Sequence, residues 1–327
     1  MSGFPATRLR RLRRTQGLRA MFDGALPGPE KWVWPAFVVE GRGRREPIAS
    51  MPGQCRLSVD ELIRDVEPVV RSGVGGLLLF GVPDASRKDA AGRRAFHEQG
   101  AVQKAVRAVK RAFPELVVFT DVCLCAYTDH GHCGVLDARG EVDNDATNAI
   151  LARVAATHAA AGADVVAPSA MMDGQVAALR QALDREGFAQ TLIMSYSTKF
   201  ASSLYGPFRE AEASAPKKGD RRGYQASYAD PRQALLESEL DEAEGADILM
   251  VKPSLFYGDI LFRLRERTRL PIAAYNVSGE YSMLIACAER GWGDLRGLVR
   301  ESTMALARSG ADLLISYWAN RYGEIFG

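Results

Sequence analysis

The chain has 327 residues, of which 47% are hydrophobic and 25% are charged, and its formal net charge is +2. This small charge argues against a nucleic-acid-binding surface over the whole body, and the longest apolar runs, such as residues 77–82, are too short to cross a bilayer. We therefore predict a globular cytoplasmic protein that binds neither nucleic acid nor a membrane.

Residues 1–31 form the first distinct segment, with six arginines between Arg8 and Arg19. No apolar stretch or small-residue cleavage site follows them, so we do not expect a secretory signal. Arginine clusters of this kind are often solvated, or they pair with acidic residues of another subunit. We predict that residues 1–31 are an N-terminal arm that contacts another subunit.

From residue 32 onward, short apolar or β-branched runs alternate with amphipathic stretches that end in glycine. This alternation is typical of repeated strand–helix units. Helices are expected at 58–72, 144–161 and 174–186, and the first begins with a capping-box pattern of Ser58 and Glu61. Eight strands are expected, at residues 32–40, 75–83, 116–124, 163–171, 191–200, 246–254, 271–279 and 311–319.

The expected strands are nearly continuous in apolar residues, which indicates a parallel sheet covered by helices on both faces. Eight such units favour an α/β fold of the TIM (β/α)8 barrel type over an open doubly wound sheet, and we assign the barrel to residues 32–327. No glycine-rich dinucleotide fingerprint follows the first strand, so a nucleotide-binding fold gains little support. The long polar connection at about 201–230, after the fifth strand, is predicted to be an active-site lid.

Two lysines stand near the carboxyl ends of adjacent predicted strands, where barrel enzymes carry their active sites. Lys199 closes the fifth strand and Lys252 lies at the end of the sixth. Burial and mutual repulsion would lower the pKa of each amine and leave a neutral nucleophile able to attack a carbonyl. A single lysine would more readily be interpreted as an anchor for phosphate or carboxylate, but a pair favours amine–carbonyl chemistry.

Three of the five cysteines, Cys123, Cys125 and Cys133, lie close together after the third strand. Three thiolates can hold a zinc ion and leave a fourth tetrahedral position for water or substrate, which indicates a catalytic metal. The alternative is a group of small buried thiols without a metal. Between them, His130 and His132 are candidates for acid–base groups or for groups that support the metal ligands.

Motifs spread over most of the chain resemble those of the porphobilinogen synthases, also called 5-aminolevulinate dehydratases. They are DVCLCAYTDHGHCG from residue 121, VVAPSAMMDGQV from 165, MSYSTKFASSLYGPFREA from 194, GDRRGYQ from 219, LMVKP from 249 and YNVSGEY from 275. The resemblance implies a hydro-lyase that condenses two molecules of 5-aminolevulinate into porphobilinogen with loss of two waters, in tetrapyrrole and heme biosynthesis.

The resemblance also implies roles for individual residues, by matching position. Lys252 would form a Schiff base with the first substrate and Lys199 with the second, and Asp121 and Ser169 would hydrogen-bond near these lysines. The carboxylate of the first substrate would be bound by Ser278 and Tyr317. The carboxylate of the second would be bound by the lid residues Arg209, Arg221 and Gln225.

The metal and the assembly are implied in the same way. Because all three thiols are present, the resemblance implies zinc at the catalytic site, with a substrate amino group at the open position. Glu237 matches a position that binds a stimulatory magnesium in some bacterial members, although a solvated helix carboxylate is an equal interpretation. The family forms homo-octamers in which the arm embraces a neighbour's barrel.

Some stretches depart from the family pattern, namely residues 226–229, Asn276 and residues 254–258. They leave the lysines, thiols and arginines intact. Two alternatives therefore stay open: a paralogue with the same Schiff-base chemistry in specialised metabolism, and a noncatalytic metal-binding assembly protein that kept the fold.

Overall fold

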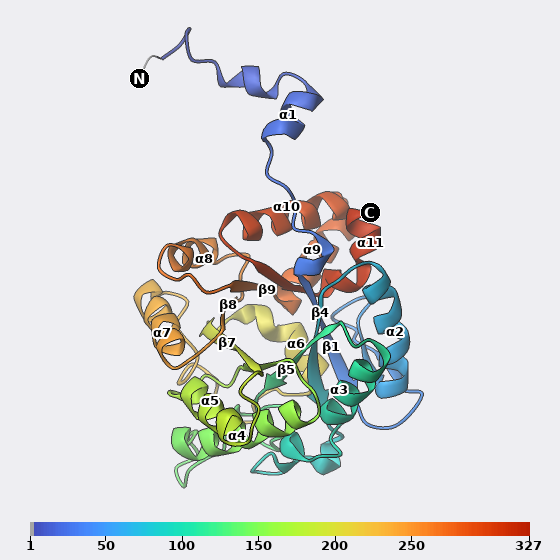
Figure 1. The fold of residues 1–327 in the computed structure, drawn as a ribbon, viewed down its shortest axis with the longest axis vertical. Helices are drawn as coiled ribbons and strands as arrows, with labels where there is room; N and C mark the ends of the chain where they lie inside the picture. Colours follow the sequence, from blue (N-terminus) through green and yellow to red (C-terminus); the bar gives the residue numbers. More distant parts are fainter. Residues whose placement is uncertain (1–2) are drawn as a thin grey trace.

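The computed structural model describes residues 3–327, and most of them form a closed barrel (Figure 1). Its parallel strands follow one another in the order β1-β4-β5-β6-β7-β8-β9-β10, and β10 pairs with β1 to close the ring. Helices fill most connections between these strands and cover the outside of the ring (Figure 1). The TIM (β/α)8 barrel predicted from the sequence is confirmed.

The strands of the barrel coincide with those expected, but most are shorter at one or both ends. The barrel strands are β1 (Trp32–Val39), β4 (Gly76–Val82), β5 (Val117–Val122), β6 (Val165–Pro168), β7 (Leu192–Lys199), β8 (Ile248–Lys252), β9 (Ile272–Asn276) and β10 (Leu313–Ser316). Two further strands, β2 (Arg45–Pro47) and β3 (Cys55–Ser58), lie beside β1 outside the ring. Because β5 ends at Val122, the first cysteine of the predicted metal site lies just beyond the strand.

The helices include the three that were expected. They are α1 (Gln16–Phe22), α2 (Val59–Arg71), α3 (Ala101–Ala112), α4 (Asn144–Ala160), α5 (Gln175–Arg185), α6 (Gly206–Glu212), α7 (Pro231–Ala243), α8 (Gly258–Arg265), α9 (Ser278–Glu289), α10 (Leu295–Arg308) and α11 (Tyr322–Phe326). Short α6 lies within the segment interpreted as a lid.

Two details near the start of the barrel differ from expectation. The hairpin of β2 and β3 was not predicted, because its strands have only three and four residues. The capping box at Ser58 was wrong, although α2 begins directly after that residue. The Ser58 hydroxyl donates to Asp60 Oδ1 at 2.6 Å and accepts from the Arg44 backbone N–H at 2.9 Å, so it ties the hairpin to the helix instead of capping it.

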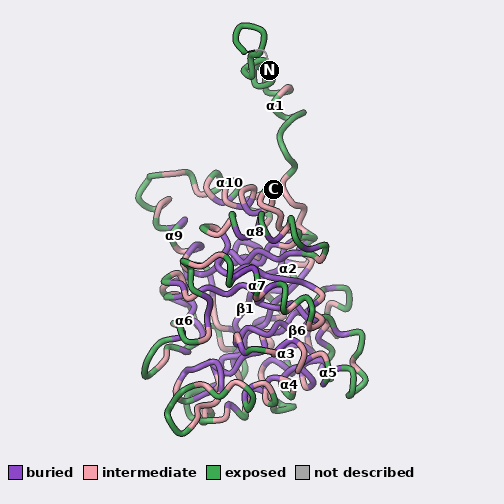
Figure 2. Tube along the Cα trace, turned by 90° about the vertical axis from the view of Figure 1, so that its left-hand side faces the viewer, coloured by how far each residue is buried: buried purple, intermediate pink, exposed green. Residues whose placement is uncertain are grey.

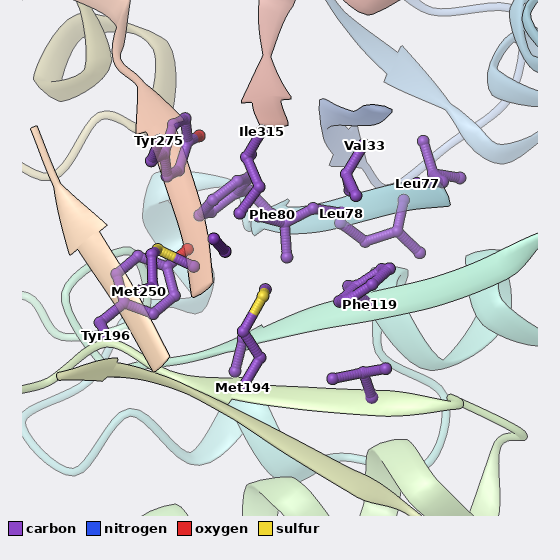
Figure 3. Close-up of a cluster of buried hydrophobic side chains, with 14 of the residues drawn as sticks. Val33, Leu77, Leu78, Phe80, Phe119, Met194, Tyr196, Met250, Tyr275 and Ile315 are labelled. Atoms are coloured by element: carbon purple, nitrogen blue, oxygen red, sulfur yellow. The ribbon is translucent and has the colours of Figure 1, made fainter. Parts of the chain in front are cut away.

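The barrel interior is filled by apolar side chains from successive strands (Figure 3). In Figure 3 the side chains of Phe119, Met194, Met250 and Ile315 point toward a common centre from four different strands. Each of them is at most 4% exposed, so the interior is a packed core and not a channel. This packing fixes the strand ends, and the reactive side chains stand on those ends.

Residues 3–23 extend away from the barrel (Figure 1) and almost all of them are exposed (Figure 2), whereas residues 24–31 run back to the barrel, where the Pro29 carbonyl oxygen accepts from the Gly75 backbone N–H at 3.2 Å. Helix α1 buries no residue, and Phe4, Met21 and Phe22 are 78%, 76% and 58% exposed. Apolar side chains presented in this way leave a surface that a partner can cover. Within the described chain, no helix combines the length and apolarity needed to cross a bilayer.

Candidate active site

The two predicted lysines are neighbours at the carboxyl ends of β7 and β8. Lys199 and Lys252 are paired in the register of these parallel strands, and they are 5% and 3% exposed. Their placement follows from the barrel geometry, because equivalent positions of adjacent strands lie side by side. The sequence pattern thus located both amines at one end of the barrel.

Lys252 lies in an aromatic enclosure. Its Nζ is 4.2 Å from the ring centre of Tyr275 and 4.8 Å from those of Tyr196 and Phe208. Burial, followed by the positive charge of Lys199, lowers the pKa of Lys252 to about 7. A large fraction of this amine is therefore neutral near neutral pH, as a nucleophile requires.

Lys199 is held by the end of the neighbouring strand. Its Nζ donates to the backbone carbonyl oxygen of Ser169 at 2.5 Å, so Ser169 reaches this lysine through its main chain. Asp121 shares a small pocket with both lysines. Burial, followed by the nearby carboxylate of Glu212, raises the pKa of Asp121 to about 7, and its Oδ1 is buried without a hydrogen-bond partner.

The three cysteines come together beside this pocket. The sulfurs of Cys123, Cys125 and Cys133 all lie within 4.8 Å of one another and are buried. Contacts with the other two thiols lower the pKa of Cys133 well below its usual value, while burial raises the pKa of Cys123. Clustered thiols of this kind fit a soft metal ion, whose charge would favour the thiolate form of all three.

Residues of the 201–230 segment close the mouth of the barrel. The Tyr205 hydroxyl donates to the backbone carbonyl oxygen of Lys252 at 3.1 Å, and Phe208 of α6 packs over the same lysine. The pocket between the lysines and α6 has a free volume of only about 10 Å³, roughly the space of one water molecule. Neither of two substrates fits into this closed arrangement.

Three polar side chains of the same segment have buried donors without partners. They are Arg209 Nε, Arg221 Nε and Gln225 Nε2. The Arg221 Nη2 group does donate to the backbone oxygens of Ser214 and Gly131, at 2.6 and 3.0 Å. These two bonds fix the side chain, while its Nε has no partner. Buried donors are normally paired, and the three unpaired ones indicate that an acceptor from a ligand belongs here.

Nearly the whole chain matches one protein family. The sequence profile of the delta-aminolevulinic acid dehydratase family matches residues 6–325. Relatives of that name from Synechococcus elongatus and Escherichia coli are both 50% identical, with 97% of this chain and 97% of the relative covered in the first case and 95% of each in the second. The chain belongs to the delta-aminolevulinic acid dehydratase family. The family resemblance drawn from the motifs is confirmed.

A solved structure supports the same assignment at the level of the fold. The delta-aminolevulinic acid dehydratase of Toxoplasma gondii, in complex with its reaction product porphobilinogen, has a TM-score of 0.95 and 41% identity to this family member. The match covers 97% of this chain and 91% of that one.

Two further predicted residues of this family member already have partners at the pocket. The Ser278 hydroxyl accepts from the Phe208 backbone N–H at 3.0 Å, and the Tyr317 hydroxyl lies 3.2 Å from that of Tyr275. Ser278 thus contacts α6 itself. The Ser278 hydroxyl itself donates to the Leu204 carbonyl oxygen at 3.4 Å, so an acceptor bound at Ser278 would replace that contact.

The histidines between the cysteines contact neighbouring loops, and the Tyr224 hydroxyl that His132 contacts also accepts from the Cys133 backbone N–H at 3.4 Å. The ring nitrogens of His132 contact the Lys218 carbonyl oxygen at 2.9 Å and the Tyr224 hydroxyl at 3.2 Å, both in the 201–230 segment. His130 contacts the Ala90 carbonyl oxygen and the His132 backbone N–H. Both imidazoles therefore hold loops in place, and neither belongs to the metal-binding group found among the described residues.

Glu237 lies apart from the lysines. It stands on α7 and lines a separate cleft of about 840 Å³ together with Asp173 and Gln225. Burial, followed by the charges of Asp173 and Glu244, raises the pKa of Glu237. The cysteines form the one group of three or more potential metal ligands found within residues 3–327, so Glu237 has no ready-made set of partners.

Glu212 is the functional-site residue that the sequence reasoning missed. It is 2% exposed, and its Oε2 accepts from the Cys125 thiol at 3.1 Å. Phe208, Ala211 and Glu212 are the buried residues of α6, at helical spacings of three and four. A carboxylate within this apolar stripe was the signal in the sequence, but it becomes visible only once α6 is recognised as a helix.

Proposed function

We propose that this chain is an enzyme that condenses two molecules of 5-aminolevulinate into porphobilinogen, with release of two water molecules. The observation that carries the proposal is the pair of buried lysines side by side at the barrel mouth, one of them with a pKa lowered to about 7. The family to which the chain belongs supports the same activity, as does the Toxoplasma gondii relative with porphobilinogen bound.

Lys252 is proposed to bind the first substrate covalently. Its neutral amine attacks the ketone carbon, a C=N bond forms, and the ketone oxygen leaves as water with two protons. The Lys252 amine is enclosed by the rings of Tyr196, Phe208 and Tyr275 and lines the pocket, where it can meet a substrate. Asp121, which also has a pKa of about 7 and lines the same pocket, is proposed to exchange the protons that this step requires.

Lys199 is proposed to bind the second substrate in the same way, and Ser169 to position its amine through the backbone carbonyl. The carboxylate of this substrate is assigned to Arg209, Arg221 and Gln225, whose unpaired donors match the acceptor oxygens of a carboxylate. Ser278 and Tyr317 are assigned to the carboxylate of the first substrate. The tight pocket requires the 201–230 segment to move as a lid when substrates enter.

Cys123, Cys125 and Cys133 are proposed to hold a zinc ion, since clustered thiolates suit zinc and leave one position open. When bound there, zinc would supply Lewis acidity and lower the pKa of a substrate amino group. A regulatory magnesium is proposed at Glu237, on the match of its position to the family and on the negative charges of Asp173 and Glu244, which act on it. Zinc is the resident metal on which the test below depends.

The proposal also covers the subunit contacts of the N-terminal arm and the cellular location of the protein. The exposed apolar and arginine side chains of residues 3–31 suit contact with further copies of this chain, and a homo-octamer is the assembly proposed. The domain division proposed is this arm, the barrel of residues 32–327 and the lid. A cytoplasmic location is supported by the free thiol state of all five cysteines.

The test is a product assay on the purified chain. With zinc and 5-aminolevulinate present, porphobilinogen should form and give a coloured adduct with an aldehyde reagent, and a chelator should abolish its formation. No product in the presence of zinc would overturn the proposal and favour the noncatalytic alternative. Product from a different amino-ketone, but not from 5-aminolevulinate, would favour the paralogue.

A further inference from the structure

Glu212 is a buried carboxylate beside the cysteines. It is 2% exposed, and it lines the same pocket as Lys199, Lys252 and Arg221. The one side chain in hydrogen-bonding contact with it is the Cys125 thiol, at 3.1 Å. The three adjacent thiols form a group that fits a metal ion, so Glu212 lies next to the place where such an ion would be held.

The end of α6 that carries Glu212 is fixed in place. The Arg56 side chain donates to the carbonyl oxygens of Ala211 and Glu210, each at 2.6 Å. The Lys88 Nζ donates to the Ala213 carbonyl oxygen at 2.7 Å, on the other side of Glu212 in the chain. Its backbone is thus fixed beside the cysteines.

The contact with Cys125 has the separation expected of two ligands on one ion. Zinc binds sulfur at about 2.3 Å and carboxylate oxygen at about 2.0–2.2 Å, so neighbouring donors lie about 3–4 Å apart. The three sulfurs form a group within 4.8 Å of one another, and Glu212 is not a member of that group. Its carboxylate would have to move toward Cys123 and Cys133 to complete a set of four ligands.

We propose that Glu212 is the fourth protein ligand of the metal in the substrate-free enzyme. The inference rests on the metal proposed at the three cysteines. It adds that, before substrate binds, protein groups fill all four coordination positions of that metal. Because Glu212 belongs to α6, movement of the 201–230 segment withdraws the carboxylate and opens the fourth position. The same movement of the 201–230 segment would therefore admit the substrate and expose the metal.

The experiment compares the full chain with Glu212→Gln and Glu212→Ala, and uses Glu210→Gln as the matched control, since Glu210 is exposed on the same helix. Cobalt(II) alone is added as the probe, and its thiolate charge-transfer and ligand-field absorption bands are recorded. Zinc affinity is measured by competition with a chromophoric chelator. Both variants at position 212 should alter the ligand-field bands and weaken zinc binding by at least about tenfold, while Glu210→Gln changes neither.

Thermal unfolding gives a second readout that a merely structural role would not produce. Without metal, Glu212→Gln should unfold at about the temperature of the unaltered chain, because glutamine keeps the size of the side chain. With zinc, the unfolding temperature of the variant should rise less than that of the unaltered chain, because the variant has lost a ligand. This comparison also shows whether each variant folds.

The outcomes distinguish a failure of the proposed metal site from a failure of the proposed role of Glu212. If the unaltered chain gives no thiolate-to-cobalt charge-transfer band, the metal proposal itself is wrong. If that band is present but both variants at position 212 match Glu210→Gln in ligand-field bands and zinc affinity, the metal site stands and the role of Glu212 is overturned.

Discussion

The lysine pair and the lid arginines meet at the same barrel mouth but are built in opposite ways. Lys199 and Lys252 stand on adjacent strands with a fixed register, and both are buried. Arg209 and Arg221 belong to a long connection and keep buried donors without partners. This difference fits the proposal that the barrel positions the reactive amines, whereas the lid supplies the donors for a substrate carboxylate.

The largest effect is expected from removing the amine of Lys252. Lys252→Met keeps much of the volume of the side chain but cannot form a Schiff base, so product formation should fall by at least about a thousandfold. The product assay with zinc and 5-aminolevulinate measures this loss. Because methionine suits the aromatic enclosure, the variant should unfold at no lower temperature than the unaltered chain. Near-normal turnover would show that the prepared amine is not the nucleophile.

A smaller effect is expected from the lid. Arg209→Gln should raise the KM for 5-aminolevulinate by about 10- to 100-fold, since a hydrogen bond to a charged group contributes about 1.5–3 kcal/mol. The control is Arg222→Gln, because the side chain of this neighbouring lid arginine is 77% exposed. Steady-state kinetics over a range of substrate concentrations separates KM from kcat. An equal KM in the two variants would remove Arg209 from the binding site.

The pH dependence of the amine sharpens the comparison further. The pKa of Lys252 is lowered to about 7, first by burial and then by the charge of Lys199. Only the neutral amine reacts, so the rate of Schiff-base formation should rise with pH through about 7 and level off above it. At pH 6 the rate should be about tenfold lower than on the plateau at high pH.

Replacing Lys199 tests the second cause of that shift. Lys199→Met removes the repulsion, so the pKa of Lys252 should rise and the midpoint of Schiff-base formation should move to higher pH. Lys199→Arg keeps the positive charge and should leave the midpoint near that of the unaltered chain. The rate of borohydride trapping at Lys252 across the pH range gives the midpoint directly, and identical midpoints in the two variants would contradict this electrostatic account.

The smallest effect concerns the contact that joins the two regions. Tyr205→Phe removes the hydroxyl that donates to the backbone oxygen of Lys252 at 3.1 Å. The free energy of unfolding should decrease by about 1 kcal/mol, the usual contribution of one such hydrogen bond. Urea titration measures the decrease. An unchanged midpoint would mean that this bond does not stabilise the closed lid.

The same contrast explains what could be predicted from the sequence. The periodic alternation of apolar runs and glycine-capped helices placed every barrel strand, and therefore placed Lys199, Lys252 and the cysteines at one end of the barrel. These positions depend on regular local patterns. A strand end can be read from such a pattern, because barrel geometry brings all the carboxyl ends together.

The rest depends on contacts between distant segments. The hydroxyl of Ser58 bonds Asp60 and the β2 hairpin instead of capping α2, and His132 is occupied by lid residues nearly a hundred positions away. Glu212 escaped notice for the same reason, since its partner Cys125 lies 87 positions earlier in the chain. No local pattern encodes which distant group meets a side chain.

Borohydride reduction in the presence of 5-aminolevulinate is the most direct test of the central claim that Lys252 forms a Schiff base with the first substrate. The reduced protein is digested and the modified peptide is identified by mass spectrometry. The account predicts a reduced adduct on Lys252, with any further adduct confined to Lys199. Formation of porphobilinogen without an adduct on Lys252 would contradict it.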